Sequence, residues 1–451
     1  MNTSIKETEN QLREISETVL KLAKKYGASD AELSLNRGEG LSVEIHMGTV
    51  DKLEYNRDQG LNLSVYMGMH TGTASTGDLS PQAIQDTVKA ACNIARYTEE
   101  DKYTGLADAE LMATGIATNS ADLDLYHPWD LSAEKAIELA TECEKHARDF
   151  DPRIINSDGS SISTYSGMSL ISNSHGFTGV LPSSRHSLSC SVIGQEVGDE
   201  DMQRDYWYST SRVNAELESA ETVGKKAAEK TLARLRGKQI STREANVLYS
   251  PEMARSIISH FAGAIAGGAQ YRKSTFLLDS VGTKVFPEFI RLHEQPHLVR
   301  AFGSGYFDKE GVATSNRDIV TDGIVQGYIM GSYTARQLGL KTTANSGGTH
   351  NLTLESTGQN FNEMLKMLDT GFLVTELIGS GVNNMTGDYS RGAAGFWVEN
   401  GEIQYPVEEV TVAGNLKDMF QRIVAVGNDI DLRSGTRTGS ILIEGLMIAG
   451  S

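Results

Sequence analysis

Alternating apolar and polar residues near the N-terminus restrict the folds open to this chain. The apolar members of three such runs are Ala31, Leu33 and Leu35; Leu41, Val43, Ile45 and Met47; and Leu61, Leu63, Val65 and Met67. A period of two is the period of a strand with one buried face. The glycines that separate or interrupt the runs predict turns, at Gly38, Gly40, Gly48, Gly60 and Gly68. We therefore expect an antiparallel meander, covered on one face by helices.

Helical patterns flank the runs. Apolar residues recur at helical spacing up to Tyr26, where Gly27 can end a helix. Ser80-Pro81 is a typical helix start, with a serine cap and proline in the first position. Ser132 is expected to cap another helix. A long helix is predicted over residues 214–235.

The length of 451 residues exceeds one ordinary core and predicts two domains. The polar stretch after Gly237-Lys238 gives the best boundary, so we expect domains at residues 1–238 and 239–451. Hairpin signals mark the second half, with Asp322-Gly323 and Asn400-Gly401 between apolar runs. The predicted class is α+β, with N-terminal helices on an antiparallel meander and a mainly antiparallel C-terminal half with short helices.

Composition narrows the function. The net charge of −18 makes nucleic acid an unexpected partner, because DNA affinity depends on basic side chains that neutralise phosphates. No apolar run approaches membrane-spanning length. The polar N-terminus does not resemble a signal peptide, so a cytoplasmic location is expected. Three widely spaced cysteines, Cys92, Cys143 and Cys190, are expected to be reduced thiols.

One segment, residues 257–274, has the framework of a metal-site helix without the ligands. A zinc protease helix needs two histidines on one face and a glutamate that activates water. Here Ala264 lies one turn after His260, and Gly263 lies one turn after Ser259. These small residues cannot hold a cation, but they suit close contact with another surface.

This segment and several later blocks resemble the TldD/PmbA family, the modulators of DNA gyrase. The metal-bearing branch reads His-Glu-x-x-x-His before an aromatic-basic run, and anchoring that run on Tyr271-Arg272-Lys273 aligns its residues with Ser259, His260 and Ala264. That branch also takes a C-terminal cysteine ligand, whereas this chain has no cysteine after Cys190. The chain therefore resembles the PmbA (TldE) branch, which lacks the metal motif. Other matching blocks are Asn173-Ser174-His175-Gly176, Arg336-Gln337-Leu338-Gly339-Leu340-Lys341, residues 387–397, Gly401-Glu402-Ile403-Gln404-Tyr405-Pro406, Gly414-Asn415-Leu416 and Val426-Gly427-Asn428-Asp429.

The resemblance implies a non-catalytic subunit of a cytoplasmic metallopeptidase that degrades or processes unfolded and leader peptides. A TldD-like partner in a heterodimer would carry the zinc, and this chain would bind no cofactor and would shape the substrate cavity. Peptide-binding candidates are Tyr271, Arg272, Lys273, Tyr389 and Arg391, although the first three also suit a solvated surface and the last two a hairpin flank.

Two alternatives remain open. His293-Glu294-Gln295-Pro296-His297 matches the zincin pattern His-Glu-x-x-His and would make the chain a self-sufficient metallopeptidase. That chemistry requires an unbroken helix, whereas Pro296 would end a short helix that Pro287 could begin. On this second interpretation, residues 293–297 form an exposed helix end and bind no metal. The other alternative is a homodimeric peptide-binding scaffold.

Overall fold

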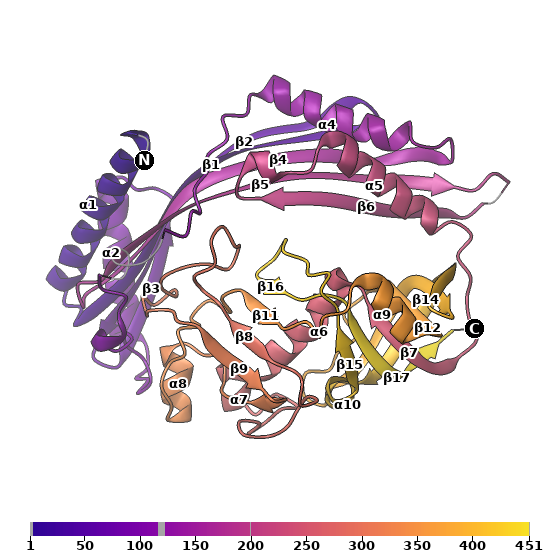
Figure 1. Cartoon of the computed structure of the whole chain (residues 1–451). Helices are drawn as coiled ribbons and strands as arrows, with labels where there is room; N and C mark the ends of the chain where they lie inside the picture. Colours follow the sequence, from indigo (N-terminus) through magenta and orange to yellow (C-terminus); the bar gives the residue numbers. More distant parts are fainter. Residues whose placement is uncertain (1–2, 116–121, 199, 451) are drawn as a thin grey trace.

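The computed structural model describes residues 3–115, 122–198 and 200–450. A long curved sheet forms the N-terminal half and arches over the C-terminal half (Figure 1). Its strand order is β3-β2-β1-β4-β5-β6, and all of its pairings are antiparallel. The strands are β1 (Asp30–His46), β2 (Thr49–Met67), β3 (His70–Thr76), β4 (Ile154–Asn173), β5 (Thr178–Gln195) and β6 (Met202–Ser211).

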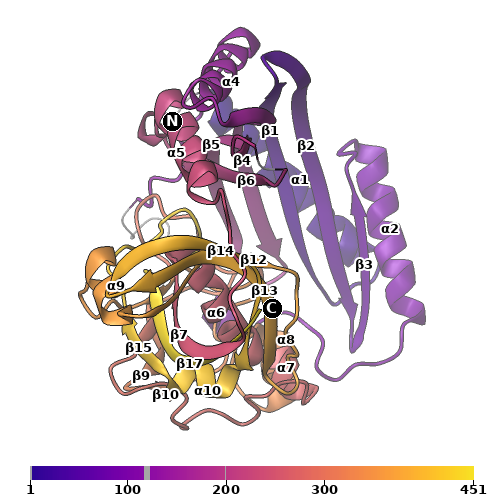
Figure 2. The same cartoon turned by 90° about the vertical axis from the view of Figure 1, so that its right-hand side faces the viewer.

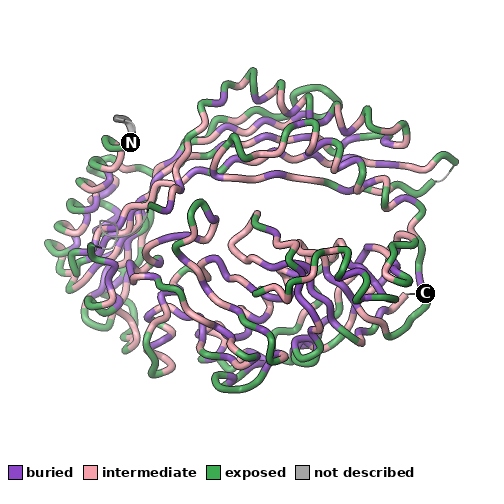
Figure 3. Tube along the Cα trace, viewed as in Figure 1, coloured by how far each residue is buried: buried purple, intermediate pink, exposed green. Residues whose placement is uncertain are grey.

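Two pairs of helices cover the outer face of this sheet (Figures 1 and 2). The helices α1 (Thr3–Lys25) and α2 (Pro81–Tyr97) enclose one apolar core with Leu33, Leu35 and Leu63. The helices α4 (Ala133–Arg148) and α5 (Ala220–Ala233) enclose another with Val43 and Ile45. The alternation of buried and exposed positions along the strands is visible in Figure 3. The expected meander covered by helices is confirmed.

Serine caps form as expected. The Ser80 side chain accepts a hydrogen bond from the Ala83 amide, and that of Ser132 accepts one from the Lys135 amide. The predicted helix over residues 214–235 is too long at its start. Residues Asn214–Glu216 form a separate 3-10 turn, and α5 begins only after its own cap, Ser219. The three cysteines are buried free thiols.

Three of the five predicted glycine turns are wrong, because Gly38, Gly40 and Gly60 lie inside long strands. Their role is close approach rather than turning. A Cβ on Gly38 would lie 2.1 Å from the Tyr165 hydroxyl oxygen, and one on Gly40 would lie 2.6 Å from the carbonyl oxygen of Thr164. Because glycine has no Cβ, the Tyr165 side chain and the Thr164 carbonyl group can lie directly against the strand at these points.

The C-terminal half contains two sheets. A six-stranded sheet has the order β14-β13-β12-β7-β17-β15, and an extra β14–β17 pairing closes it into a small barrel. A five-stranded sheet has the order β10-β9-β8-β11-β16. The strands are β7 (Arg243–Tyr249), β8 (Leu292–Glu294), β9 (Arg317–Thr321), β10 (Ile324–Val325), β11 (Leu352–Leu354), β12 (Gly371–Ile378), β13 (Asp388–Glu399), β14 (Glu402–Asn415), β15 (Ile423–Val426), β16 (Thr436–Arg437) and β17 (Ile441–Ala449).

Most pairings here are antiparallel, although β7–β12 and β11–β16 are parallel. Short helices accompany the sheets: α6 (Pro251–Ala264), α7 (Gly267–Tyr271), α8 (Ser332–Leu338), α9 (Phe361–Leu368) and α10 (Leu416–Gln421). Both hairpin signals are confirmed, because Asp322-Gly323 joins β9 to β10 and Asn400-Gly401 joins β13 to β14 with positive φ angles at all four residues. The α+β class is confirmed.

The two halves are joined by buried polar contacts. The guanidinium of Arg212 donates to the carbonyl oxygens of Ala301 and Phe302 at 3.2 Å. Arg433 lies over the rings of Trp207 and Tyr208. The division at residue 238 stays a prediction, since Lys238 itself forms a bridge with Val407 in the C-terminal sheet.

Candidate functional site

The segment with the metal-site framework folds as two short helices rather than one. Helix α6 follows strand β7 directly, with proline at its first position, and ends at Ala264. The chain is then pinned to a neighbouring segment, because the Gly267 amide donates to the carbonyl oxygen of Ile329 and the Ile329 amide donates to that of Ile265. A Cβ on Gly267 would lie 2.7 Å from the Cβ of Met330. Glycine is needed there for this close contact.

The three degenerate ligand positions carry no set of side chains that could bind a metal. Ser259 is exposed, and its hydroxyl donates to the Arg255 carbonyl of its own helix at 2.8 Å. His260 is half-buried, while Ala264 packs in the core with 4% of its surface exposed. Among the described residues, no group of three or more histidine, cysteine or acidic side chains is arranged to hold a metal ion. The zinc implied by the family therefore does not fit this helix.

A cluster of polar side chains surrounds His260 instead. Its ring lies edge-on to Tyr389, with centroids 6.2 Å apart. Two further side chains complete the cluster, because both interact with Tyr389. They are Tyr249, at the end of β7, and Arg391, on β13. The Tyr249 and Tyr389 hydroxyls lie close enough to interact with each other. Two buried nitrogen atoms lack a hydrogen-bond partner within the described structure: Nε2 of His260 and Nε of Arg391.

Burial sets the ionisation of this cluster. It raises the pKa of Tyr249 and of Tyr389, so both stay neutral hydroxyls. Burial, and next the positive charge of Arg391, lower the pKa of His260, so its imidazole stays neutral near pH 7. The cluster offers hydrogen-bond donors beside one guanidinium, which is an arrangement for holding polar or anionic groups rather than for activating water.

The peptide-binding candidates separate in space. Tyr389 is 1% exposed and belongs to the hydrophobic core. Arg391 is half-buried beside it. Tyr271, Arg272 and Lys273 are exposed at the end of α7, where Tyr271 lies 6.2 Å edge-on from Tyr103 of the N-terminal half. These four exposed or half-exposed residues remain predictions for peptide contact.

The zincin-like pattern is not on a helix. His293 and Glu294 lie in strand β8, where successive side chains point to opposite faces, so the expected helix end is wrong. Glu294 is 2% exposed and receives hydrogen bonds from Arg317, from the Asn345 side chain and from the His350 amide, each at 2.8 Å. His297 pairs with the Thr314 hydroxyl. Glu294 is therefore a buried structural anion and not a base beside a metal.

Two features escaped the sequence reasoning. Tyr249 looked like an ordinary strand residue, although it ends β7 directly before Ser250-Pro251, where α6 begins. Glu32 lies on β1 near Asp308 and Glu310 of the other half, which no local pattern could reveal. Both depend on contacts between distant segments.

The comparisons agree with this fold along almost the whole chain. Sequence models of the PmbA/TldA metallopeptidase family match domain 1 at residues 31–95, the central domain at residues 126–235 and the C-terminal domain at residues 242–450. Metalloprotease PmbA of Escherichia coli O157:H7 is 49% identical over 97% of this chain and 96% of its own length. The PmbA homologue of Haemophilus influenzae is 46% identical over 99% and 98%.

Solved structures give the same result. A protein described as a modulator of DNA gyrase from Bacteroides thetaiotaomicron superposes with a TM-score of 0.92 at 30% identity, covering 97% of this chain and 99% of that one. TldE from Thermococcus kodakarensis shares the fold, with a TM-score of 0.83 at 18% identity over 97% and 100%.

The chain belongs to the PmbA/TldD family of metallopeptidases. Within that family it falls in the PmbA branch, on the strength of near full-length identity to the metalloproteases PmbA. No helix among the described residues is long and apolar enough to cross a membrane.

Proposed function

We propose that this chain is the non-catalytic subunit of a cytoplasmic metallopeptidase, and that it pairs with a TldD-like subunit that carries zinc. The complex would degrade or process unfolded and leader peptides. In this arrangement the chain contributes wall and binding surface to the substrate cavity, while bond cleavage occurs on the partner. The family relationship supplies the reaction class, and the site described above argues for the division of labour.

The observation that carries the proposal is the state of helix α6. It lies where the resemblance aligns the family's metal helix, yet it presents Ser259, His260 and Ala264 in place of two ligands and a base. Ala264 has no donor atom, and the Ser259 hydroxyl bonds to its own helix, so neither position supplies a usual zinc ligand. A chain that retains the fold and has lost this chemistry suits a supporting subunit.

The inner face of the long sheet supports a role in holding peptides. Small hydroxyl side chains alternate with the buried residues of β4 and β5, and they point away from the helices: Ser161, Ser163, Ser187, Ser189 and Ser191. This face is turned towards the C-terminal half (Figure 1). A cavity of about 420 Å³ opens there beside Ser161 and Ser189. The strands β4 and β5 are paired on both sides, so this face would hold a peptide through its side chains: the serine hydroxyls together with charged groups such as Asp158 and Arg204.

The test is a peptidase assay of the purified chain with and without a TldD-like subunit, using an unstructured peptide as substrate. We expect no cleavage by this chain alone and cleavage by the mixture that exceeds that of the TldD-like subunit alone. A second test is the substitution Arg391→Gln at a proposed peptide contact. It should raise the KM of the mixture more than it lowers kcat. Cleavage by this chain alone would overturn the proposal. A stable homodimer that binds peptide but never stimulates the partner would favour the scaffold alternative.

A further inference from the structure

A belt of polar residues crosses the outer face of the long sheet between the two helix pairs. On β1 the buried apolar series stops after Leu35 and resumes at Leu41, and Arg37 and Glu39 occupy the same face between them. The pairing continues the belt onto both neighbours, with Gln59 and Met168 opposite Arg37, and Arg57 and Ser166 opposite Glu39. Met168 belongs to the apolar core under α1 and α2, whereas Arg37, Glu39, Arg57, Gln59 and Ser166 belong to neither core.

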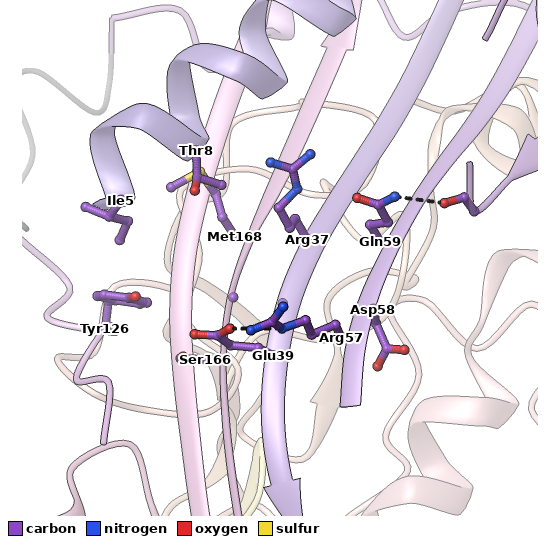
Figure 4. A pocket seen from close by; sticks show the side chains of 13 residues that line it. Ile5, Thr8, Arg37, Glu39, Arg57, Asp58, Gln59, Tyr126, Ser166 and Met168 are labelled. Atoms are coloured by element: carbon purple, nitrogen blue, oxygen red, sulfur yellow. Dashed lines mark hydrogen bonds and ion pairs between the residues drawn. The ribbon is translucent and has the colours of Figure 1, made fainter. Parts of the chain in front are cut away.

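The belt is the floor of a cavity of about 610 Å³ (Figure 4). Helix α1 contributes Ile5 to one wall, and Tyr126 stands at the lower end of the same side. The volume lies within the range of about 300–1,000 Å³ that is typical of small-molecule sites. The cavity lies on the helix-covered face of the sheet, beside Ile5 of α1. That face is turned away from the C-terminal half (Figure 1), so the cavity is separate from helix α6.

Arg37 is the most informative residue in this cavity. Its Nη1 donates to the side-chain oxygen of Gln11 at 2.7 Å. Its Nε is buried and has no hydrogen-bond acceptor. Within the described ranges no carboxylate forms an ion pair with Arg37. A buried donor without an acceptor costs about 1–3 kcal/mol, so a guanidinium in this state is prepared for an acceptor that enters the cavity.

A negative pole lies beside this cation. Glu39 is two residues further along the same face, at a strand spacing of about 7 Å. Within the part of the chain that the structure describes, Glu39 forms one ion pair, with Arg57 at 3.8 Å, and the Arg57 side chain is 88% exposed. The Tyr126 hydroxyl lies near Ser166 and Glu39, and burial raises its pKa. The cavity therefore has a positive end at Arg37, a negative end at Glu39 and an apolar wall formed by Ile5 and Met168.

We propose that this cavity binds a short zwitterionic peptide, of about two residues, with its C-terminal carboxylate on Arg37 and its α-ammonium group beside Glu39. The backbone spacing of Arg37 and Glu39 is compatible with a dipeptide, because two residues of extended chain also span about 7 Å. A carboxylate satisfies the free Nε–H of Arg37 in a charge-assisted hydrogen bond. An apolar side chain of the peptide rests against Ile5 and Met168. This inference does not depend on the proposed function, because it uses a different face of the molecule.

The experiment is isothermal titration of the full chain with the dipeptide Ala-Leu, its N-acetyl form and its C-terminal amide. We expect saturable binding of unmodified Ala-Leu at millimolar or lower concentration. The substitution Arg37→Gln should weaken it about tenfold or more, and should have little further effect on the amide, which lacks the carboxylate. Likewise Glu39→Gln should weaken the free dipeptide but not the acetylated form. Arg13→Gln is the matched control, because Arg13 pairs with Glu9 on α1 and does not line the cavity.

The outcomes separate clearly. If Arg37→Gln weakens binding of Ala-Leu but not of its C-terminal amide, the carboxylate is assigned to Arg37. If Glu39→Gln weakens binding of Ala-Leu but not of its N-acetyl form, the ammonium group is assigned to Glu39. Absence of saturable binding of Ala-Leu to the wild-type chain overturns the proposal. So does binding that Arg37→Gln leaves unchanged, or binding of inorganic phosphate with no binding of the dipeptide. Thermal melting of each variant identifies any loss of folding, and Glu39→Gln provides the test if Arg37→Gln does not fold.

Discussion

The ring of His260 stands edge-on to that of Tyr389, with the two planes inclined by 80°. His260 occupies the position where the resemblance aligns the catalytic glutamate of the metal-bearing branch. Here the residue is a neutral, half-buried ring packed against a core tyrosine. The side chain at this position therefore packs against the core and does not act as a catalytic base. Restoring a metal site would require a glutamate here as well as the missing metal ligands.

We predict that the isolated chain contains well under one zinc ion per molecule, and that Ser259→His, His260→Glu and Ala264→His together do not create a peptidase. The third ligand would still be absent, because no cysteine follows Cys190, and two histidines alone hold zinc weakly. Metal analysis and cleavage of an unstructured peptide check both statements. A stoichiometric, tightly held zinc or robust turnover by the triple variant would contradict them.

Neighbouring positions on α6 should respond in opposite directions to added bulk. Ala264→Leu overpacks the core and should lower the free energy of unfolding by about 1–3 kcal/mol. Gly263 is exposed, and a Cβ there meets no atom within 4 Å, contrary to the close packing that the sequence suggested. Gly263→Ala should therefore raise the free energy of unfolding by about 0.5–1 kcal/mol. Urea titration of the two variants measures both, and equal effects would show that the assigned faces are incorrect.

Glu294 should matter for stability and the two histidines near it should not matter for catalysis. Glu294→Ala leaves Arg317 buried without its carboxylate, at a cost of about 3–5 kcal/mol in unfolding free energy. The double variant His293→Ala, His297→Ala should keep the activity of a reconstituted complex within a few-fold of wild type. A loss of several orders of magnitude in a folded double variant would restore the metal-site alternative.

The contact between Glu32 and the C-terminal half should make stability depend on pH. Burial, and then the charges of Glu310 and Asp308, raise the pKa of Glu32 from 4.5 to about 7, although the Tyr66 hydroxyl bond opposes the shift. Burial raises that of Asp308 to about 6. Since folding raises both pKa values, the folded state holds these protons more tightly than the unfolded chain. The associated stability is fully present below about pH 4 and is lost as the pH rises through 6 to 7.

Replacing Glu32 with glutamine should flatten this part of the pH profile, by up to about 3 kcal/mol between pH 5 and pH 8. The control is Glu288→Gln, whose side chain is 83% exposed and should leave the profile unchanged. Unfolding by urea at several pH values provides the measurement. A profile for wild type that gains stability over this range, with no change in Glu32→Gln, would rule out the contact as its source.

Local patterns determined much of the fold. Three kinds of feature could be predicted from the sequence, because each depends on residues close together in the chain. They are the alternation along β1 and β2, the serine caps at Ser80 and Ser132, and the turns at Asp322-Gly323 and Asn400-Gly401. Glycines inside strands misled the prediction, since nothing local distinguishes a turn at Gly48 from the crossing of Tyr165 over Gly38. The family and its branch were also readable, because they depend on blocks of adjacent residues.

Only the tertiary structure decided which side chains meet. Tyr249, His260 and Tyr389 come from three elements separated along the chain, and their shared burial fixes their ionisation. The strand at His293 and Glu294 was decided by pairing with β9 and β11, which overrides a helix-like motif. The break in alternation between Leu35 and Leu41 led to a prediction of turns, whereas the structure has a polar belt there at Arg37 and Glu39. Its cavity exists because two helix pairs leave that part of the sheet uncovered. Sequence fixes local periodicity and capping, whereas burial and charge proximity arise from packing distant segments together.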